Sequence, residues 1–213
     1  MLLPFQDRAE AGRLLAAELA CRKLTNVVVL ALPRGGVPVA AEVASALHAP
    51  LDVVVVRKLG VPWQPELAMG AICGITRILD GEEVDFLHIS RARIEKVAAR
   101  ETLEMQRREN LYRSGRPALD VRGKTVVLVD DGLATGASMA AAARHIKSLH
   151  PAKVIVAAPV ASYDARHRLS RETDERICLA SPDPFVAVGQ WYSNFDQVSD
   201  AQVQEIMSRF AKT

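Results

Sequence analysis

Short apolar runs alternate along the chain with longer stretches in which apolar residues recur at helical spacing. The runs predict buried strands at residues 27–30, 52–56, 124–129, 153–159 and 176–179. The stretches between them predict helices at residues 8–22, 37–47, 91–112, 137–149, 163–170 and 200–211. Such alternation is typical of an α/β protein with a mostly parallel sheet. We therefore expect an open, twisted sheet flanked by helices.

Residues 59–90 interrupt this alternation. Their first part predicts a loop because it contains Gly60, Pro62, Pro65 and Gly70. Residues 71–79 are assigned to short strands, with a turn near Asp80-Gly81. In the helix expected at 91–112, interleaved Arg and Glu residues favour a solvated face with i,i+4 pairs over a contact with phosphate or RNA.

Length and charge narrow the classes of protein that fit this pattern. The 213 residues suit one large domain, or one domain with a small appendage. The net charge of +2 creates no strong field toward nucleic acid or a membrane, so any recognition of an anion must come from a local arrangement. No apolar run approaches the roughly 20 residues of a membrane span.

The three cysteines, Cys21, Cys73 and Cys178, are scattered and form no Cys-x-x-Cys pair. This spacing argues against a disulfide framework or a zinc site and suits a reducing compartment. The first residues show neither the basic region nor the apolar region of a signal peptide. We therefore expect a cytoplasmic protein.

The segment with the clearest chemistry is residues 126–138. An apolar strand ends in Asp130 and Asp131, and a turn of small residues leads into a helix. The N–H groups and the dipole of a helix start favour phosphate, and adjacent carboxylates can accept hydrogen bonds from the two hydroxyls of a ribose. This arrangement predicts a ribose 5-phosphate site. A simple turn with an N-cap is the alternative.

This segment closely resembles the signature of type I phosphoribosyltransferases that binds 5-phosphoribosyl-1-diphosphate (PRPP). The resemblance runs from about residue 27 to 195 and is strongest here, with Gly132 standing where the pattern has an aliphatic residue. It implies that Asp130 and Asp131 hold the ribose hydroxyls. It also implies that the 5-phosphate is held by Ala134, Thr135, Gly136, Ala137 and Ser138. The segment is also similar to a bacterial group of predicted phosphoribosyltransferases whose acceptor is unassigned.

The same resemblance identifies Pro33-Arg34-Gly35-Gly36 as the loop that binds diphosphate. Arg34 would supply a charge-assisted donor beside the amides of Gly35 and Gly36, and the Pro33–Arg34 peptide bond would be cis. The alternative is an ordinary turn between a strand and a helix.

Arg57 and Lys58 follow the second expected strand and resemble the basic pair that meets the diphosphate in relatives. By resemblance, Arg57, Lys58 and Asp131 are the catalytic residues, and residues 59–69 form a flap that closes over the site. The alternatives are a surface basic pair and an ordinary loop.

A variable C-terminal hood selects the base in this family, and residues 182–192 resemble its purine-binding strand. Phe185 is the first candidate to stack on a base, and Val186, Trp191 and Tyr192 are further candidates; core packing is the alternative for each. Ala134 stands where enzymes for oxopurines place an Asp. Hypoxanthine and guanine are therefore disfavoured as acceptors, although adenine is not established.

The resemblance implies a single domain over residues 1–213, with a core at about 24–165, a flap and insertion at about 59–115, and a hood at about 170–213. It implies transfer of phosphoribosyl from PRPP to a nitrogenous acceptor, with Mg²⁺ carried by the diphosphate and ribose oxygens. No direct protein ligand of the metal is assigned, and Asp130 and Asp131 could reach it through water or ribose hydroxyls. A regulator that senses PRPP without turnover is the second hypothesis, and a hydrolase or phosphorylase of ribose phosphates is the third. A nucleic-acid partner is not expected, and a homodimer is left open.

Overall fold

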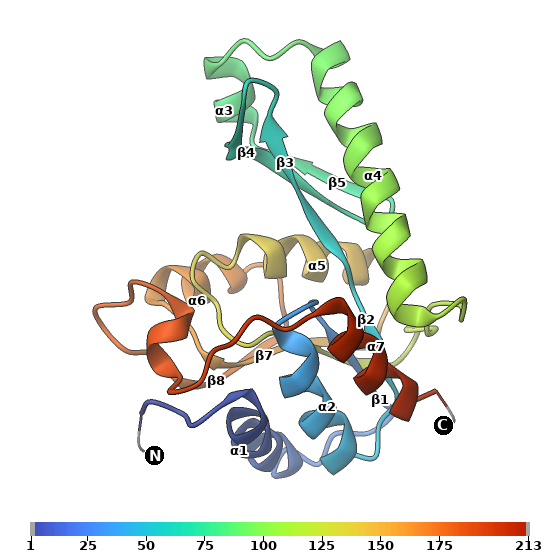
Figure 1. The fold of residues 1–213 in the computed structure, drawn as a ribbon, viewed down its shortest axis with the longest axis vertical. Coiled ribbons are helices and arrows are strands. Elements are labelled where there is room, and N and C mark those ends of the chain that lie inside the picture. Colours follow the sequence, from blue (N-terminus) through green and yellow to red (C-terminus); the bar gives the residue numbers. More distant parts are fainter. Residues whose placement is uncertain (1–2, 212–213) are drawn as a thin grey trace.

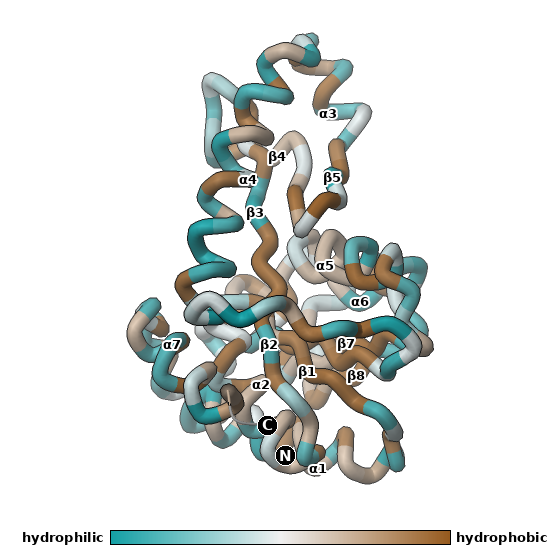
Figure 2. Tube along the Cα trace, turned by 90° about the vertical axis from the view of Figure 1, so that its right-hand side faces the viewer, coloured by the Kyte–Doolittle hydropathy of each residue, from teal (hydrophilic) through white to brown (hydrophobic). Residues whose placement is uncertain are grey.

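A computed structural model describes residues 3–211. Its centre is a parallel five-stranded sheet in the order β2-β1-β6-β7-β8. The strands are β1 (Val27–Ala31), β2 (Leu51–Val53), β6 (Thr125–Val129), β7 (Lys153–Val160) and β8 (Glu175–Ala180). The central strands are buried on both faces, which explains why they read as continuous apolar runs and appear brown in Figure 2.

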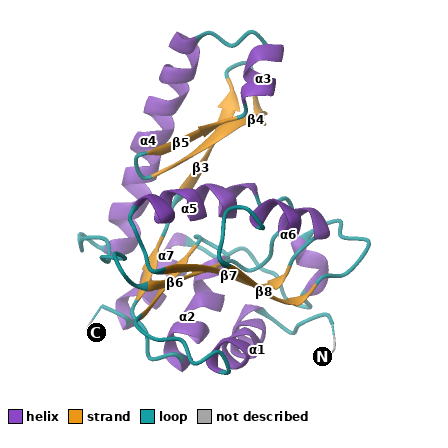
Figure 3. Ribbon diagram, turned by 180° about the vertical axis from the view of Figure 1, so that it is seen from behind, coloured by secondary structure: helices purple, strands orange, loops and turns teal. Residues whose placement is uncertain are grey.

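Helices cover both faces of this sheet (Figures 1 and 3). On one face lie α1 (Arg8–Ala20), α2 (Gly36–Ala46) and α7 (Asp200–Arg209), and on the other lie α5 (Ala137–Ser148) and α6 (Tyr163–Leu169). Side chains along β6 alternate between the two cores: Val127 and Val129 pack toward α1 and α2, whereas Val126 and Leu128 pack toward α5. The predicted α/β class and sheet are confirmed.

A second unit, which we call the finger (residues 56–113), stands over α5 (Figure 1). It contains an antiparallel sheet of β3 (Val56–Val61), β4 (Gln64–Cys73) and β5 (Thr76–Leu79), followed by α3 (Gly81–Phe86) and α4 (Arg91–Arg113). Leu59, Val61 and Met69 pack against Ile94 and Val97 in a separate small core. None of the helices within residues 3–211 is both long and apolar enough to cross a membrane.

The finger differs from the loop expected at its first part. Residues 59–69 form most of a β-hairpin, and the register shifts on both sides of Gly60, where a Cβ would lie 2.4 Å from the carbonyl oxygen of Pro65. Gly60 therefore allows the two strands to approach closely, and it does not interrupt the hairpin. The chain turns at Gly74 and Ile75, and Asp80 instead caps α3 by accepting a bond from the N–H of Glu83.

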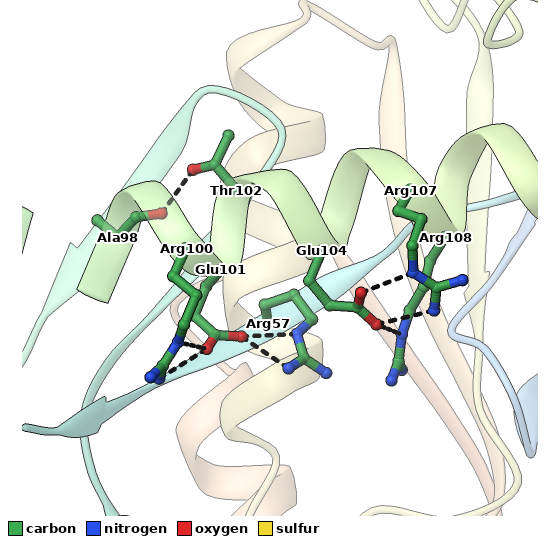
Figure 4. A network of polar contacts seen from close by, with 8 residues as sticks. All are labelled: Arg57, Ala98, Arg100, Glu101, Thr102, Glu104, Arg107 and Arg108. Atoms are coloured by element: carbon green, nitrogen blue, oxygen red, sulfur yellow. Dashed lines mark hydrogen bonds and ion pairs between the residues drawn. The ribbon is translucent and has the colours of Figure 1, made fainter. Parts of the chain in front are cut away.

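The starts of helices α1 and α4 agree with the sequence-based expectation better than the hairpin does. Asp7 caps α1, because its Oδ1 accepts from the N–H of Glu10 at 2.8 Å. Ser90 is the N-cap residue of α4, although its side chain makes no capping bond. As expected, α4 carries solvated ion pairs at helical spacing, in which Glu104 accepts from Arg107 and Arg108 (Figure 4).

Two short N- and C-terminal segments, remote in sequence, also pair. Phe5 forms a parallel bridge with Tyr192, and its N–H donates to the carbonyl oxygen of Trp191 at 2.8 Å. The N–H groups of Ser193 and Asn194 donate to the carbonyl oxygens of Phe5 and Gln6, respectively. This pairing brings the start of α1 to the carboxyl edge of the sheet.

Candidate functional site

Three loops meet where β1, β6 and β7 end, at the same edge of the parallel sheet. Backbone hydrogen bonds join them. The N–H of Leu32 donates to the carbonyl oxygen of Val129 at 2.9 Å, and the N–H of Ser162 donates to that of Leu133 at 2.9 Å. The hydroxyl of Ser162 also donates to the carbonyl oxygen of Ala134. The loops therefore form one connected edge.

The turn between β6 and α5 leaves the start of α5 open to solvent. The exposed residues of the turn are Ala134, Thr135, Ala137 and Ser138. The N–H of Ala140 bonds to the carbonyl oxygen of Gly136 at 2.9 Å, so the amides that precede it have no partner one turn back in the helix. The N–H of Ala137 meets the hydroxyl oxygen of Thr135 at 3.4 Å, a long bond that a ligand can replace. These amides and the positive end of the helix dipole make the turn suited to a phosphate.

Gly136 is required by the geometry of this turn. It is the N-cap residue of α5 and has φ of 70°, in the left-handed region that favours glycine. A Cβ there would also lie 3.1 Å from Cα of Ala165 in α6. The sequence-based assignment of Gly136 to close backbone approach is consistent with both observations.

Asp130 and Asp131 lie side by side at the end of β6. Oδ1 of Asp130 accepts from the N–H of Asp131 at 2.8 Å. Burial raises the pKa of Asp130 well above its ordinary value, and the charge of Asp131 raises it further. Burial also raises the pKa of Asp131, while the adjacent Arg8 guanidinium opposes the rise. The two carboxyls are therefore harder to ionise together than two ordinary aspartates.

Asp131 is already engaged by a residue that the sequence reasoning missed. Nε of Arg8 donates to Oδ2 of Asp131 at 2.7 Å, and the side chains are only 12% and 13% exposed. The two residues lie 123 positions apart, so no local spacing could link them. The one available signal was electrostatic, because a cation in the first turn of a helix opposes the dipole and benefits from an acidic partner.

The loop after β1 packs directly against this acid pair. Its Pro33–Arg34 peptide bond is cis, as predicted. A Cβ on Gly35 would lie 2.0 Å from Oδ2 of Asp131, and one on Gly36 would lie 2.7 Å from the carbonyl oxygen of Val129. The two glycines therefore serve close packing. The N–H of Gly36 already donates to the carbonyl oxygen of Leu32 at 3.1 Å, so its amide is not open to a diphosphate, contrary to the prediction. Arg34 lies at the rim, with Nη1 3.5 Å from Oδ1 of Asp200.

Arg57 and Lys58 do not form the basic pair that was expected. They belong to β3 and not to the end of β2, and neighbouring residues of a strand point to opposite faces. Arg57 donates from Nε and Nη2 to Oε2 of Glu101 at 2.9 and 2.7 Å, against α4 (Figure 4). Lys58 is opposite Ala71 on β4, and its Nζ contacts Glu66. Only Lys58 therefore points to the face of the finger that looks toward α5.

A cavity of about 570 Å³ lies between that face and α5. Its walls include Gly70 and Ala71 of β4 and Ala137 and Arg144 of α5. Because Ala137 also belongs to the phosphate turn, the cavity adjoins the edge of the candidate site. The small residues on both walls leave this space open.

The C-terminal candidates separate into two groups. Tyr192 is buried, donates to the carbonyl oxygen of Asp131, and packs its ring 5.0 Å from that of Phe195. It therefore supports the acid pair, and its burial matches core packing, the alternative given for it above. Phe185 and Trp191 pack on each other, with ring centroids 6.2 Å apart. Val186 is 74% exposed and touches nothing that assigns it a role.

Comparison with known proteins agrees with this geometry. Residues 5–192 match the model of the phosphoribosyl transferase domain. A curated relative from Mycobacterium tuberculosis, named "Putative phosphoribosyl transferase", is 48% identical over 207 residues, which are 96% of this chain and 46% of the relative. This chain thus spans about half the length of the curated relatives it matches.

Solved structures with this fold are also known. The crystal structure of TT1426 from Thermus thermophilus is 44% identical, with a TM-score of 0.85 and coverage of 98% of this chain and 100% of that one. A hypothetical protein from Neisseria gonorrhoeae with bound ppGpp covers 98% of each chain at 12% identity and a TM-score of 0.52, which shows the fold alone. On the match of the domain model over residues 5–192, the chain belongs to the phosphoribosyl transferase domain family.

Proposed function

We propose that this chain binds PRPP at the carboxyl edge of its sheet and transfers the phosphoribosyl group to a nitrogenous acceptor, releasing diphosphate. The observation that carries the proposal is the open amino end of α5 beside the acid pair of β6. A sugar phosphate offers one anion and two neighbouring hydroxyls, and the edge offers donors and acceptors in the same arrangement.

The 5-phosphate lies in the turn of residues 134–138. The amides of Gly136, Ala137 and Ser138 donate to it, and the exposed hydroxyls of Thr135 and Ser138 add donors. The carbonyl oxygen of Ala134 is held by Ser162. This bond keeps the turn in a shape that presents amides to the ligand.

The ribose hydroxyls donate to Asp130 and Asp131. As acceptors, these carboxylates act best when both are ionised, which burial and mutual repulsion oppose in the free protein. Binding of the ligand is therefore expected to favour loss of a proton from the pair. The hydroxyls then compensate the buried charge with hydrogen bonds.

The diphosphate lies between the Pro33–Gly36 loop and the finger. The amide of Gly35 and the guanidinium of Arg34 stabilise the charge that grows as the bond to C1 breaks. Lys58 approaches from the finger, on the face that carries Ala71. Arg57 acts indirectly, because its bonds to Glu101 hold β3 against α4.

Magnesium fits this site as part of the substrate complex. Within residues 3–211 no three His, Cys, Asp or Glu side chains gather as a metal site. Two adjacent carboxylates suit an ion that prefers few protein ligands and several phosphate or water oxygens. When bound, Mg²⁺ would neutralise charge on the diphosphate, and Asp130 and Asp131 would hold the ribose hydroxyls.

The acceptor approaches from the C-terminal segment, where Phe185 and Trp191 present paired aromatic rings. The flat face of a purine-like base can stack on such rings. Ala134 supplies no carboxylate to read an oxopurine, which disfavours hypoxanthine and guanine. We place the protein in the cytoplasm because its three cysteines are free.

The direct test is release of diphosphate from Mg-PRPP, measured with a panel of bases and amines. Asp131→Asn is expected to lower the rate by about 10- to 100-fold, since it removes a charged acceptor. Asp85→Asn, on the exposed helix α3, is the matched control and should leave the rate unchanged. Tight binding of PRPP without diphosphate release under any condition would instead identify a sensor.

A further inference from the structure

We propose that Arg8 is a positioning residue, which holds one oxygen of Asp131 so that the other faces the ribose of the ligand. This inference rests on the proposed function. It concerns a residue on α1 that lies outside every loop assigned above to the ligand.

Three contacts fix the guanidinium of Arg8. Its Nε donates to Oδ2 of Asp131 at 2.7 Å, and its Nη1 donates to the carbonyl oxygen of Asp196 at 2.8 Å. Its Cζ lies 3.8 Å from the centroid of the Phe195 ring, a cation–π distance. A flexible side chain held by three groups from two segments has lost most of its rotamer freedom.

The backbone around Arg8 is held equally firmly. We call residues 5–8 and 191–196 the clasp, because the first segment pairs with the second. The N–H of Phe5 donates to Trp191 at 2.8 Å, and the N–H of Asn194 donates to Gln6 at 2.9 Å. Arg8 follows directly after this pairing, so its position relative to the sheet edge is set by two segments that lie far apart in the sequence.

Asp131 is enclosed on several sides by this arrangement. Gly35 lies so close to Oδ2 that even a Cβ would not fit, and Tyr192 donates to the backbone carbonyl oxygen of Asp131. Arg8 occupies Oδ2 from α1. A carboxylate has about four acceptor positions on its two oxygens, so Oδ1 keeps capacity for a ribose hydroxyl.

Stability alone is a weak explanation for this ion pair. Removing two charges from water costs free energy that their attraction often only offsets. Arg8 is also the first residue of α1, where the helix dipole disfavours a cation. A role in orienting a ligand-binding carboxylate explains why the protein keeps this ion pair despite the cost of desolvation and the unfavourable helix dipole.

The test compares two ligands by titration calorimetry in the full chain. Ribose 5-phosphate uses the phosphate turn and the acid pair, whereas inorganic phosphate uses the turn alone. Arg8→Gln is expected to lower the affinity for ribose 5-phosphate about tenfold, since it removes a charge-assisted bond to Asp131. The affinity for phosphate should not change. Arg8→Lys should recover part of the loss. Arg13→Gln, an exposed change of the same charge on the same helix, should alter neither affinity.

A double-mutant cycle separates positioning from a general effect. If Arg8 acts through Asp131, then Arg8→Gln adds nothing to the loss already caused by Asp131→Asn. Should Arg8→Gln fail to fold, Arg8→Lys and Phe195→Leu allow the same comparison. The first replaces the guanidinium that bonds to Asp131, and the second removes the ring on which the guanidinium packs. Each should lower the preference for ribose 5-phosphate over phosphate.

The inference is overturned if these variants keep the wild-type preference for ribose 5-phosphate over phosphate, or if both ligands weaken in parallel. A wild-type protein that binds neither these ligands nor PRPP would overturn the proposed function as well. Normal binding by wild type and variants alike would remove only the role of Arg8.

Discussion

The side chain of Val188 fills the space beside Gly132, where a Cβ would lie only 2.3 Å from its Cγ1. The sequence pattern of the family places an aliphatic residue at this position. Here the volume comes instead from the short 3-10 helix of the C-terminal segment, Val188–Trp191. Gly132 and Val188 therefore form one packing unit that sets the distance between the hood and the acid pair.

Gly132→Ala should push Val188 out of this position. Overpacking of a fitted contact costs about 1–3 kcal/mol, and the melting temperature falls accordingly. Val188→Ala in the same chain should restore most of the loss, because the added and removed methyl groups occupy the same space. Gly81→Ala is the control, since no atom lies within 4 Å of its Cβ position. A Gly132→Ala protein that melts with the wild type would contradict this contact.

Asp130→Asn should stabilise the free protein and lower its affinity for Mg-PRPP. The change removes a carboxyl group that burial makes costly to ionise, but keeps the oxygen that accepts from the N–H of Asp131. A gain of about 0.5–2 kcal/mol at pH 7 is expected, as is common when a strained functional site is relieved. Thermal unfolding of the free protein measures the gain, and titration with Mg-PRPP measures the loss.

The pH dependence of this gain has a definite sign. The pKa of Asp130 is raised in the folded state, so the folded chain binds a proton that the unfolded chain releases above about pH 3.9. Wild-type stability therefore falls as pH rises from there through the folded-state pKa. The advantage of Asn should be full above that pKa and vanish near pH 4. A constant difference across the range would rule out the buried charge as its cause.

Arg57 and Lys58 should give opposite phenotypes. Arg57→Gln leaves Oε2 of the buried Glu101 without its donors, although Arg100 still holds Oε1, and should destabilise the protein by about 1–3 kcal/mol. Lys58→Gln is a surface change that should alter stability by less than about 0.5 kcal/mol. It should nevertheless slow diphosphate release about tenfold or more. Melting curves and initial rates check the pair, and the reverse pattern would restore Arg57 to the site.

Much of the fold could be predicted because the sheet is built from local signals. Each central strand is a continuous apolar run, and β6 with its turn and α5 was placed within a residue or two. In the finger, α4 and the strand region at 71–79 were expected, but the hairpin of β3 and β4 was missed because its residues are partly exposed and interrupted by glycines. Gly60 and Gly70 allow two strands to approach closely, which composition alone cannot distinguish from a loop.

The site shows the same division. The phosphate turn and the acid pair are contiguous in sequence, so their chemistry could be predicted together. Arg8 and Tyr192 reach Asp131 from opposite ends of the chain, and only the clasp brings them there. The contact of Arg57 with Glu101 could not be predicted, because the second expected strand is divided into β2 and β3 and α4 follows much later in the sequence.

The most direct test of the central claim is to follow the backbone amides by NMR while Mg-PRPP is added. The account predicts that the largest shifts fall on residues 134–138, with further shifts at Asp130, Asp131 and Gly35. It also predicts that Asp131→Asn reduces them at equal ligand concentration. Saturable binding that leaves the turn before α5 unshifted, or shifts confined to the finger, would contradict it.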